Sequence, residues 1–467
     1  MKILYRLIYV LFLISFLALG TEIWILGILP DKYLFILIGA IVFLFVLVSL
    51  GFKFIKKGVS KVFLSIFEII FIIGSASLIF YLHTTNSFFG NINDLKEETK
   101  TYYLIVSKSS DFKHINDLNG KNIGVFMENK DAVSKLEEEI NFEKVTLNNV
   151  VDITDGMDKV DGVFLNSAYY DLICDENKDF SKRVRIIKKI TLKTESLVSG
   201  GKTNITKNSF NILISGIDVS GDISTNSRSD VNIIMTVNPK TKEILLTHIP
   251  RDYYVKLHGI NAKDKLTHAG IYGISMSALT IEDFLDIDID YYFRVNFTTL
   301  IKVVDSIGGV DVYSPFDFSE YGYRFKKGIN HLNGKEALMF SRIRHVLPGG
   351  DRDRGKHQEE VIAAILNKIT NSEVLLKNYN QLMTSLSNSF QTNMSHNDMK
   401  QFIKFQLNGM PTWNINSISV DGNGSKGQCY SMPGRNLYVM IPDEKTVSMA
   451  HKYISGIING QKYDEIN

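Results

Sequence analysis

Cysteine is scarce in this 467-residue chain, which has only Cys174 and Cys429, far apart in the sequence. No C-x-x-C pair is present, so neither a disulfide framework nor a thiolate zinc site is predicted, and we interpret the two as unrelated thiols. The histidines show no H-E-x-x-H or other ligand spacing, and no G-x-S-x-G nucleophile elbow occurs. The sequence therefore gives no support for zinc-peptidase or serine-hydrolase chemistry.

An excess of one charge is also lacking, because 52 Lys and Arg residues face 50 Asp and Glu residues, for a net charge of +2. Overall charge thus gives no support for a nucleic-acid partner, and we expect none. Hydrophobic residues make up 45% of the chain, which is enough for a sizeable core. The length predicts two or three domains.

Long apolar runs, by contrast, fill the N-terminal part of the chain, at residues 7–30, 33–52 and 62–83. Each has the length needed to cross a bilayer and carries at most one charge. A signal peptide would have a single short apolar core, so residues 1–83 are predicted to form three transmembrane helices. Glu68, inside the third run, is predicted to pair within the helix bundle or to mark a lipid contact, and a role in helix packing is an equally favoured alternative.

The loops between these runs predict the orientation of the chain in the membrane. Lys2 and Arg6 precede the first run, and the loop "KFIKKGVSK" carries four lysines, whereas the loop "PDKY" has one lysine balanced by one aspartate. By the positive-inside rule, the N-terminus and the lysine-rich loop are cytoplasmic. We therefore expect a multi-pass cell-membrane protein in which everything after about residue 84 is extracytoplasmic.

The exported part is predicted to have four segments. Residues 84–100 are interpreted as a polar stalk, and the strand and helix patterns of 101–195 predict a small α/β accessory domain. Residues 196–209 are interpreted as a linker. Residues 210–467, the C-terminal domain, are predicted to form a mixed β-sheet flanked by helices, with "VNIIMTV" and "EILLTHI" as a hairpin or meander.

Arginine is the third scarcity, because only 12 of the 52 basic residues are arginines. Four of these fall within "SRIRHVLPGGDRDRGKHQ", at Arg342, Arg344, Arg352 and Arg354. Arginine has a planar fork that binds carboxylate or phosphate oxygens in pairs, which a solvated surface charge does not need. The segment is therefore predicted to hold a doubly anionic group.

The local pattern around these arginines predicts how they are presented. "MFSRIR" alternates, which predicts a strand with Arg342 and Arg344 on one face. The helix that follows is predicted to be capped by Asp351 or Asp353. Its first turn would present Arg354 and Gln358 together, at a helix N-terminus that favours anions, while Arg352 points elsewhere.

Two further strand ends carry charged residues. Arg228 and Asp230 stand at the start of "VNIIMTV", and Arg251 and Asp252 follow its hairpin partner. Ligands of α/β sheets bind at strand ends, and carboxylates beside arginines suggest Mg²⁺ shared with substrate phosphates. Together they fit pyrophosphate chemistry, in which cations stabilise charge on the leaving phosphate. The alternative is that these are surface ion pairs worth little.

Several ordered motifs of the C-terminal domain resemble the LytR–CpsA–Psr (LCP) family, among them "SRSDVNIIMTVNPKTKEILLTHIPRDYYV", "DYYFRVNFTTLIKVVDSIGGVDVY" and "GDRDRGKHQEEVIAAIL". Three N-terminal spans followed by an accessory domain resemble its capsule-associated CpsA branch, as do "DKLTHAGIYG" and "MPGRNLYVM". The resemblance implies an extracytoplasmic phosphotransferase of Gram-positive-type bacteria. Such an enzyme moves a glycan, here a capsular polysaccharide, from a polyprenyl pyrophosphate to peptidoglycan with Mg²⁺, or Mn²⁺ in its place.

The resemblance also implies roles for individual residues. Asp230 and Asp218 would bind the metal, and Asp218, Arg251 and Asp351 would be catalytic, with Asp351 orienting arginines or acting as a base. The residues implied to bind the pyrophosphate are Arg228, Arg251, Arg342, Arg344, Arg354 and Gln358. The polyprenyl tail would lie in an apolar pocket of the same domain. The sequence departs from the family at His357, where many members have Arg, and at Thr267-His268, where Asn-Ala is commoner.

Two other functions use the same residues differently. If water attacks in place of a glycan acceptor, the protein is a polyprenyl pyrophosphate phosphohydrolase. If the site does not catalyse, the exported part is a receptor or assembly partner for other capsule proteins. The expected partners in all cases are the membrane lipid and a lipid-linked glycan, with peptidoglycan as the acceptor for the transferase.

Overall fold

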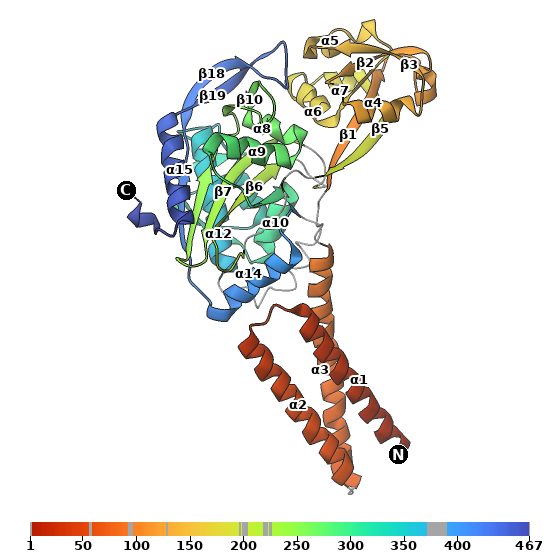
Figure 1. Ribbon diagram of the computed structural model, residues 1–467, viewed down its shortest axis with the longest axis vertical. Coiled ribbons are helices and arrows are strands. Elements are labelled where there is room, and N and C mark those ends of the chain that lie inside the picture. The colour runs from red at the N-terminus through yellow and green to blue at the C-terminus, as the bar shows by residue number, and fades with distance from the viewer. Residues whose placement is uncertain are drawn as a thin grey trace.

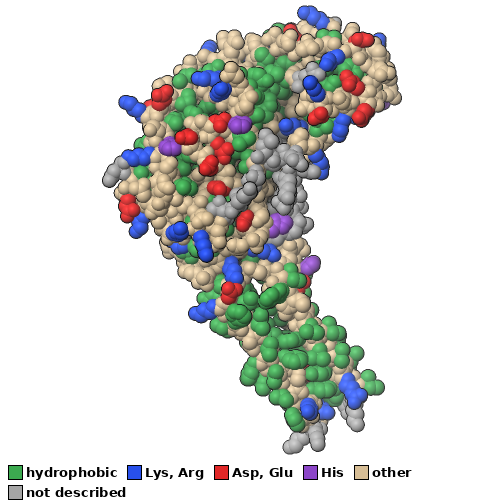
Figure 2. All heavy atoms as spheres, viewed as in Figure 1, with side chains coloured by type: hydrophobic (Ala, Val, Ile, Leu, Met, Phe, Trp, Pro, Cys, Tyr) green, Lys and Arg blue, Asp and Glu red, His purple; other side chains and the backbone are tan. Residues whose placement is uncertain are grey.

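The computed structural model describes the whole chain except residues 1, 56–57, 92–96, 128, 196–197, 199–203, 218–222, 224–226, 371–389 and 467. Three helices begin the chain, α1 (Lys2–Leu26), α2 (Asp31–Phe54) and α3 (Gly58–Asn91). All three are long and apolar enough to cross a membrane. In Figure 2 hydrophobic side chains cover this part of the surface, and Lys and Arg side chains gather at its free end.

The three helices form one end of the molecule, and the accessory domain lies at the opposite end, with the C-terminal domain between them (Figure 1). The turn between α1 and α2 lies against the C-terminal domain, where Lys404 Nζ is 2.7 Å from Asp31 Oδ1 and Leu26 and Ile28 join the domain's core. Among the three N-terminal helices, Asn86 Nδ2 of α3 donates to Glu22 Oε2 of α1 at 3.0 Å. Glu68 is fully buried, and neither of its oxygens has a hydrogen-bond partner among the described residues.

The accessory domain is a five-stranded sheet in the order β3-β2-β4-β1-β5, in which β2 is parallel to β3 and β4, while β1 is antiparallel to β4 and β5. Its elements are β1 (Glu97–Ser107), η1 (Ile115–Leu118), β2 (Lys121–Phe126), α4 (Lys130–Glu137), β3 (Phe142–Leu147), α5 (Val150–Thr154), η2 (Met157–Lys159), β4 (Gly162–Asn166), α6 (Ser167–Glu176), α7 (Phe180–Arg183) and β5 (Val184–Glu195). Asn166 ends β4 and caps α6, because its side chain accepts from Ala168 N at 2.9 Å. Regular structure also extends into the segment predicted as a stalk, since α3 continues to Asn91 and β1 begins at Glu97.

The C-terminal domain is built on a six-stranded mixed sheet in the order β16-β11-β6-β7-β8-β17. The strands are β6 (Phe210–Ile217), β7 (Ser229–Asn238), β8 (Glu243–His248), β11 (Tyr291–Asn296), β16 (Phe390–Thr392) and β17 (Asn414–Ser419). The predicted hairpin is confirmed, because β7 and β8 pair antiparallel across the turn that follows Asn238. Every residue of β8 is buried, including Glu243, Thr247 and His248, because the strand lies between β7 and β17 and both faces of the sheet are covered.

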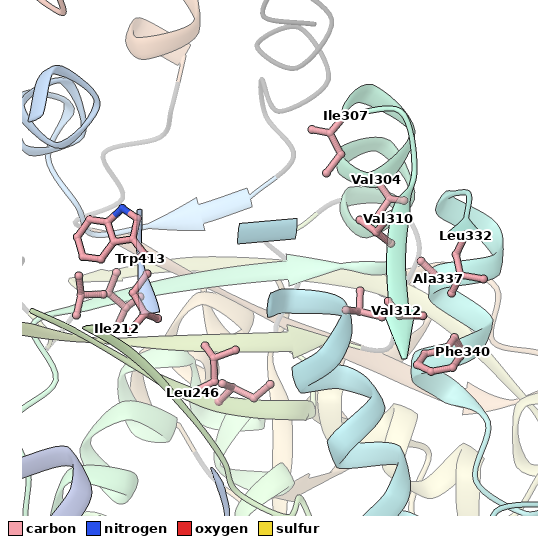
Figure 3. Close-up of a cluster of buried hydrophobic side chains, with 14 of the residues drawn as sticks. Ile212, Leu246, Val304, Ile307, Val310, Val312, Leu332, Ala337, Phe340 and Trp413 are labelled. Atoms are coloured by element: carbon pink, nitrogen blue, oxygen red, sulfur yellow. The ribbon is translucent and has the colours of Figure 1, made fainter. Parts of the chain in front are cut away.

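Helices cover both faces of this sheet. They are α8 (Leu266–Ala269), η3 (Gly270–Tyr272), α9 (Ile274–Leu285), α10 (Phe297–Ser306), α11 (Gly334–Arg342), α12 (Asp351–Ile369), α14 (His396–Gly409), α15 (Glu444–Ile458) and η4 (Tyr463–Glu465). Short strands pair outside it: β9 (Tyr254–Lys256) with β10 (Lys263–Lys265), β12 (Val310–Ser314) with β15 (Gly328–Leu332), β13 (Phe318–Glu320) with β14 (Tyr323–Phe325), and β18 (Gly422–Gln428) with β19 (Asn436–Pro442). Figure 3 shows part of the core, where Ile212 and Leu246 of the sheet point into the same cluster as Val304, Ala337 and Phe340.

The strand predicted for "MFSRIR" is wrong, because this segment is the last part of helix α11 and the turn after it. Asn333 and Glu336 form a capping box that starts the helix, and Ala337, Phe340 and Ser341 are buried at helical spacing. The two-residue alternation of "MFSRIR" is therefore a weaker signal than the helical spacing of the buried residues. Arg342 consequently ends a helix, and Arg344 follows it in a turn.

The capping predicted for α12 is also wrong. Its N-cap is Gly350, without a side-chain cap, while Asp353 accepts from Gly349 N at 2.7 Å. Asp351, the first residue of the helix, contacts arginines instead. Close packing next to this turn depends on Gly355, where a Cβ atom would collide with the His248 ring at the end of β8. The glycine thus lets the first turns of α12 approach the sheet edge.

Candidate functional site

A cavity of about 730 Å³ opens beside the ends of β6, β7 and β11, under helices α10, α11 and α12. Most of its wall is apolar, from residues of the sheet and of the covering helices. These residues are Ile214, Ile217, Val231, Val295, Leu300, Val303, Leu338, Met339, Val361, Ile362 and Ile365. Charged side chains line the rest of the same cavity, so a ligand with an apolar body and an anionic head would match both parts of the wall.

All six residues predicted to bind pyrophosphate line this cavity, together with Asp230. They come from positions far apart in the sequence: Arg228 precedes β7, Arg251 follows β8, Arg342 and Arg344 lie at the end of α11, and Arg354 and Gln358 lie on α12. Arg352, predicted to point elsewhere, is not in the wall and pairs with Asp421 at 2.6 Å. Asp218 lies outside the described residues.

Asp230 is the centre of one polar network. Its Oδ1 lies 3.1 Å from Arg251 Nη1 and accepts from Thr267 Oγ1 at 2.9 Å. Burial opposes ionisation of this carboxyl, but the charges of Arg251 and Arg228 and the Thr267 hydrogen bond outweigh it, so the pKa of Asp230 lies below its usual value. Asp230 is therefore an anion that holds Arg251 in the cavity wall.

Asp351 is the centre of the second network. Its Oδ1 lies 2.6 Å from Arg354 Nη2 and 3.9 Å from Arg344 Nη1. Arg354 is only 8% exposed, and burial together with the nearby positive charges lowers its pKa, although Asp351 and Asp230 oppose that change. This arrangement favours the first of the two roles considered for Asp351, the orientation of arginines, because its Oδ1 faces the guanidinium groups of both Arg354 and Arg344.

Three buried polar atoms of the site have no hydrogen-bond partner among the described residues, namely Arg251 Nε, Arg354 Nε and Gln358 Oε1. Gln358 does use its amide nitrogen, which donates to Ser341 O at 3.3 Å. Buried polar groups are normally hydrogen-bonded, and exceptions cluster where a ligand or ion completes the network. The two arginine N–H groups are donors, so the missing partner is an acceptor such as a phosphate oxygen.

Arg342 is held in a way that the sequence pattern did not reveal. Its guanidinium lies over the ring of Phe297, 4.2 Å from the ring centre, and Phe297 itself begins α10 and lines the cavity. A cation over an aromatic face is attracted by the ring, and more strongly for the planar guanidinium than for an ammonium group. No signal in the sequence around Phe297 could have found this contact.

The departures from the family pattern have structural explanations. His357 lies outside the cavity wall, stacked on Phe340 with ring centres 4.1 Å apart, and burial lowers its pKa to about 4. It is therefore a neutral core residue, not a phosphate ligand. Thr267 supplies the hydrogen bond to Asp230, and His268 Nδ1 is paired with Asp264 Oδ1 at 2.7 Å.

The two cysteines are free thiols, as predicted. Cys429 lies near Asp264 and His268 in a buried group whose atoms are close enough to hold a metal. The Asp264 oxygens, however, already accept from Ser431 N and Lys265 N, both at 2.7 Å, in addition to the contact with His268. This group is a satisfied hydrogen-bond centre beneath the site.

The residues beside the arginines fit a Mg²⁺ ion. Asp230 Oδ1 is occupied by Thr267 and Arg251, whereas its Oδ2 accepts no hydrogen bond from the described residues. Mg²⁺ in phosphate-transfer sites is commonly held by one or two carboxylates and by the substrate phosphates. Asp230 supplies one such carboxylate oxygen next to the arginines, and the predicted role of Asp218 stays a prediction.

Glu359, next to Gln358 on α12, is a buried carboxyl group whose protonation state can be tested. Its oxygens accept from His248 N at 3.1 Å and from Ser419 Oγ at 3.0 Å, and burial raises its pKa to about 8. The folded state thus keeps a proton that the unfolded state loses above pH 4.5, so this group's stabilising contribution falls as pH rises from about 4.5 to 8.

We expect Glu359→Gln to raise the melting temperature more at pH 8 than at pH 5, measured by thermal unfolding of the full chain. An equal change at both pH values would contradict the protonated state.

Comparison with known proteins gives the family. The LytR_cpsA_psr family model matches residues 177–452. The polyisoprenyl-teichoic acid–peptidoglycan teichoic acid transferases TagU of Bacillus licheniformis and Bacillus subtilis are each 40% identical to this chain, over 192 and 195 residues. The aligned parts cover 41% of this chain in both cases, and 61% and 62% of the respective relatives. The chain therefore matches less than two thirds of the length of these relatives.

Solved structures of the same group are also similar. The crystal structure of B. subtilis TagU is 33% identical, with a TM-score of 0.43, and covers 55% of this chain and 99% of that one. The structure described as TagT bound to LI-WTA is 26% identical, with a TM-score of 0.45, and covers 56% of this chain and 96% of that one. Since the family model matches more than half of its length, the chain belongs to the LytR-CpsA-Psr family.

Proposed function

We propose that the protein is a phosphotransferase that moves a glycopolymer from a polyprenyl pyrophosphate carrier to peptidoglycan. One observation carries this proposal: a largely apolar cavity of about 730 Å³ is also lined by arginines, and the Nε atoms of Arg251 and Arg354 are buried without an acceptor among the described residues. A prenyl diphosphate has both properties. The names of the TagU relatives, which describe transfer of polyisoprenyl-linked teichoic acid to peptidoglycan, support the same class of substrate and acceptor.

The chemistry is an in-line displacement at the phosphorus that carries the glycan. A hydroxyl oxygen of the acceptor forms a new P–O bond, the bond from that phosphorus to the bridging oxygen breaks, and polyprenyl monophosphate leaves with the electron pair. The acceptor proton passes to solvent. Arg251 and Arg354 would bind the phosphate oxygens, and the ion pairs of these arginines with Asp230 and Asp351 support this role because they fix the guanidinium groups. Mg²⁺, held in part by Asp230, would neutralise charge on the leaving phosphate.

For the glycan itself, we propose a capsular polysaccharide. The three spans and the accessory domain support this choice, because they are the features that resemble the capsule-associated branch. The relatives named above are teichoic acid transferases, so teichoic acid is the competing substrate. Supplying the purified full-length protein with each lipid-linked polymer and with peptidoglycan would decide between them.

The same assay separates transfer from hydrolysis. We expect labelled glycan to become attached to peptidoglycan as polyprenyl monophosphate is released. If glycan phosphate is released into solution at the same rate with and without peptidoglycan, the protein is a phosphohydrolase. Absence of both products would favour the receptor function.

The apolar wall predicts selectivity for chain length. Ile362 lines the cavity from α12, so Ile362→Trp should fill space that a long prenyl tail needs. We expect undecaprenyl phosphate to bind about tenfold more weakly, since losing about two buried methylene groups costs about 1.5 kcal/mol. Geranyl diphosphate, which is much shorter, should bind as before. Ile329→Trp, on the exposed surface of β15, is the matched control, and equal effects of both variants on the long lipid would contradict the assignment.

We also propose that the C-terminal domain and accessory domain are extracytoplasmic. The α1–α2 turn lies on the side of the C-terminal domain, and the end of α2, with Lys53 in its last turn, lies at the other end of the helices (Figure 1). In a background without Cys174 and Cys429, Tyr321→Cys, at a position 71% exposed, should react with an impermeant maleimide in intact cells. Gly58→Cys should react only after permeabilisation. The reverse pattern would invert the topology.

A further inference from the structure

The accessory domain contacts the site directly. Asp175, near the end of α6, places its Oδ2 2.5 Å from Nη2 of Arg228. Arg228 precedes β7 and lines the large cavity of the C-terminal domain. The pair therefore joins a residue of one domain to a proposed phosphate ligand of the other, across more than 50 positions of sequence. No motif in either segment predicts it.

A second, small cavity of about 60 Å³ lies at this contact. Leu172, Asp175 and Glu176 of α6 line one side of it. The other side includes Arg228, Asp230 and Arg251, which line the large cavity as well. These three side chains thus lie between the large cavity and the small one. Helix α6 lines the small cavity and therefore approaches Arg228 from the side away from the apolar wall.

The charges around Arg228 explain what the contact can do. The small cavity is lined by Arg228, Arg251 and Lys265 and also by four carboxylates, which belong to Asp175, Glu176, Asp230 and Asp252. An Arg side chain also loses considerable rotamer freedom when it is fixed. Asp175 is the carboxylate that pairs with Arg228, and it fixes the guanidinium through one terminal nitrogen. The other N–H groups of Arg228 make no hydrogen bond to the described residues, and the fork can hold a carboxylate and a phosphate at once.

We propose that Asp175 is a positioning residue for substrate binding, through which the accessory domain pre-orders Arg228 for the donor's diphosphate. Because an exposed ion pair is worth little in stability, the effect is expected in ligand affinity and not in folding. The inference rests on the proposed function only in taking Arg228 to be a diphosphate ligand.

The test is binding of geranylgeranyl diphosphate, with MgCl₂, to the purified full-length protein. Asp175→Asn should weaken binding about three- to tenfold, and Asp175→Glu, which keeps the charge, should recover part of the loss. Asp179→Asn is the matched control, because Asp179 belongs to the same domain and its exposed carboxylate pairs with Lys182 alone among the described residues. We expect it to bind as the unchanged protein does. In the transfer assay, Asp175→Asn should raise KM with little change in kcat.

A double-mutant cycle separates this inference from the proposed function. In an Arg228→Lys background, Asp175→Asn should have no further effect. If Arg228→Lys itself leaves diphosphate binding unchanged, then Arg228 is not a ligand and the proposed site is wrong there. If Arg228→Lys weakens binding but Asp175→Asn does not, only the positioning role is overturned. Tighter binding by Asp175→Asn would also overturn it, because Asp175 would then compete with the diphosphate.

Discussion

Arg354→Lys is expected to lower glycopolymer transfer about a hundredfold. Arg354 is the most deeply buried of the cavity's arginines and has one terminal nitrogen on Asp351 and an Nε without an acceptor in the described structure. Lysine keeps the charge but has one nitrogen in place of the planar fork, so it loses the bidentate geometry that joins Asp351 to a phosphate oxygen. Donors aimed at charge that develops in the transition state are worth roughly 2–4 kcal/mol, which is about 30- to 1000-fold in rate.

Three other swaps complete this prediction. Arg342→Lys and Arg344→Lys should lower transfer at least about tenfold, because both arginines are more exposed and Arg342 loses its stacking on Phe297. Arg352→Lys should leave the rate within about twofold, since it exchanges one surface ion pair with Asp421 for another. Melting temperatures of all four variants would show whether a loss of rate comes from unfolding. Equal rates for Arg354→Lys and Arg352→Lys would contradict the proposed phosphate-binding role and would indicate that these arginines are ordinary solvated charges.

Asp230→Asn should have a comparable effect on transfer, of about a hundredfold, for two reasons. The substitution removes the negative charge that holds Arg251, and it removes the carboxylate oxygen proposed for Mg²⁺. Asparagine keeps the shape and can still accept from Thr267, so the fold should be maintained. Titration with Mn²⁺, followed by its paramagnetic resonance signal, provides a second readout, in which the variant should bind the ion more weakly.

Asp252→Asn is the control for this prediction. Asp252 lies beside Arg251 as well, but its closest cation is Lys265 at 3.1 Å, and it does not line the large cavity. We expect its rate to fall less than about fivefold. If Asp230→Asn transfers normally with Mg²⁺ present, then Asp230 is neither the metal ligand nor the anchor of Arg251.

The composition of the site was predictable because its residues mark the ends of strongly patterned elements. Arg228, Asp230 and Arg251 flank buried strands whose apolar runs are unambiguous, and adjacent strands bring such ends to one edge of the sheet. Arg354 and Gln358 follow from the helical spacing of α12. In these cases local pattern and tertiary position agree.

Other contacts were not predictable, for physical reasons. The segment "MFSRIR" is helical despite its alternation, because the capping box at Asn333 begins a helix upstream of it. Once nucleated, the helix continues while apolar positions recur every three or four residues. The stacking of Arg342 on Phe297 and the pair of Asp175 with Arg228 join elements far apart in the chain. Such contacts depend on how finished elements and domains pack, and no local periodicity encodes them.

The most direct test of the central claim is an experimental density map of the full-length protein with geranylgeranyl diphosphate and Mg²⁺. The proposed function predicts the diphosphate within hydrogen-bond distance of Arg251 and Arg354, with the prenyl chain between α10 and α12 against Val303 and Ile365. A prenyl chain bound elsewhere, or a cavity whose arginines make no contact with the diphosphate, would contradict it.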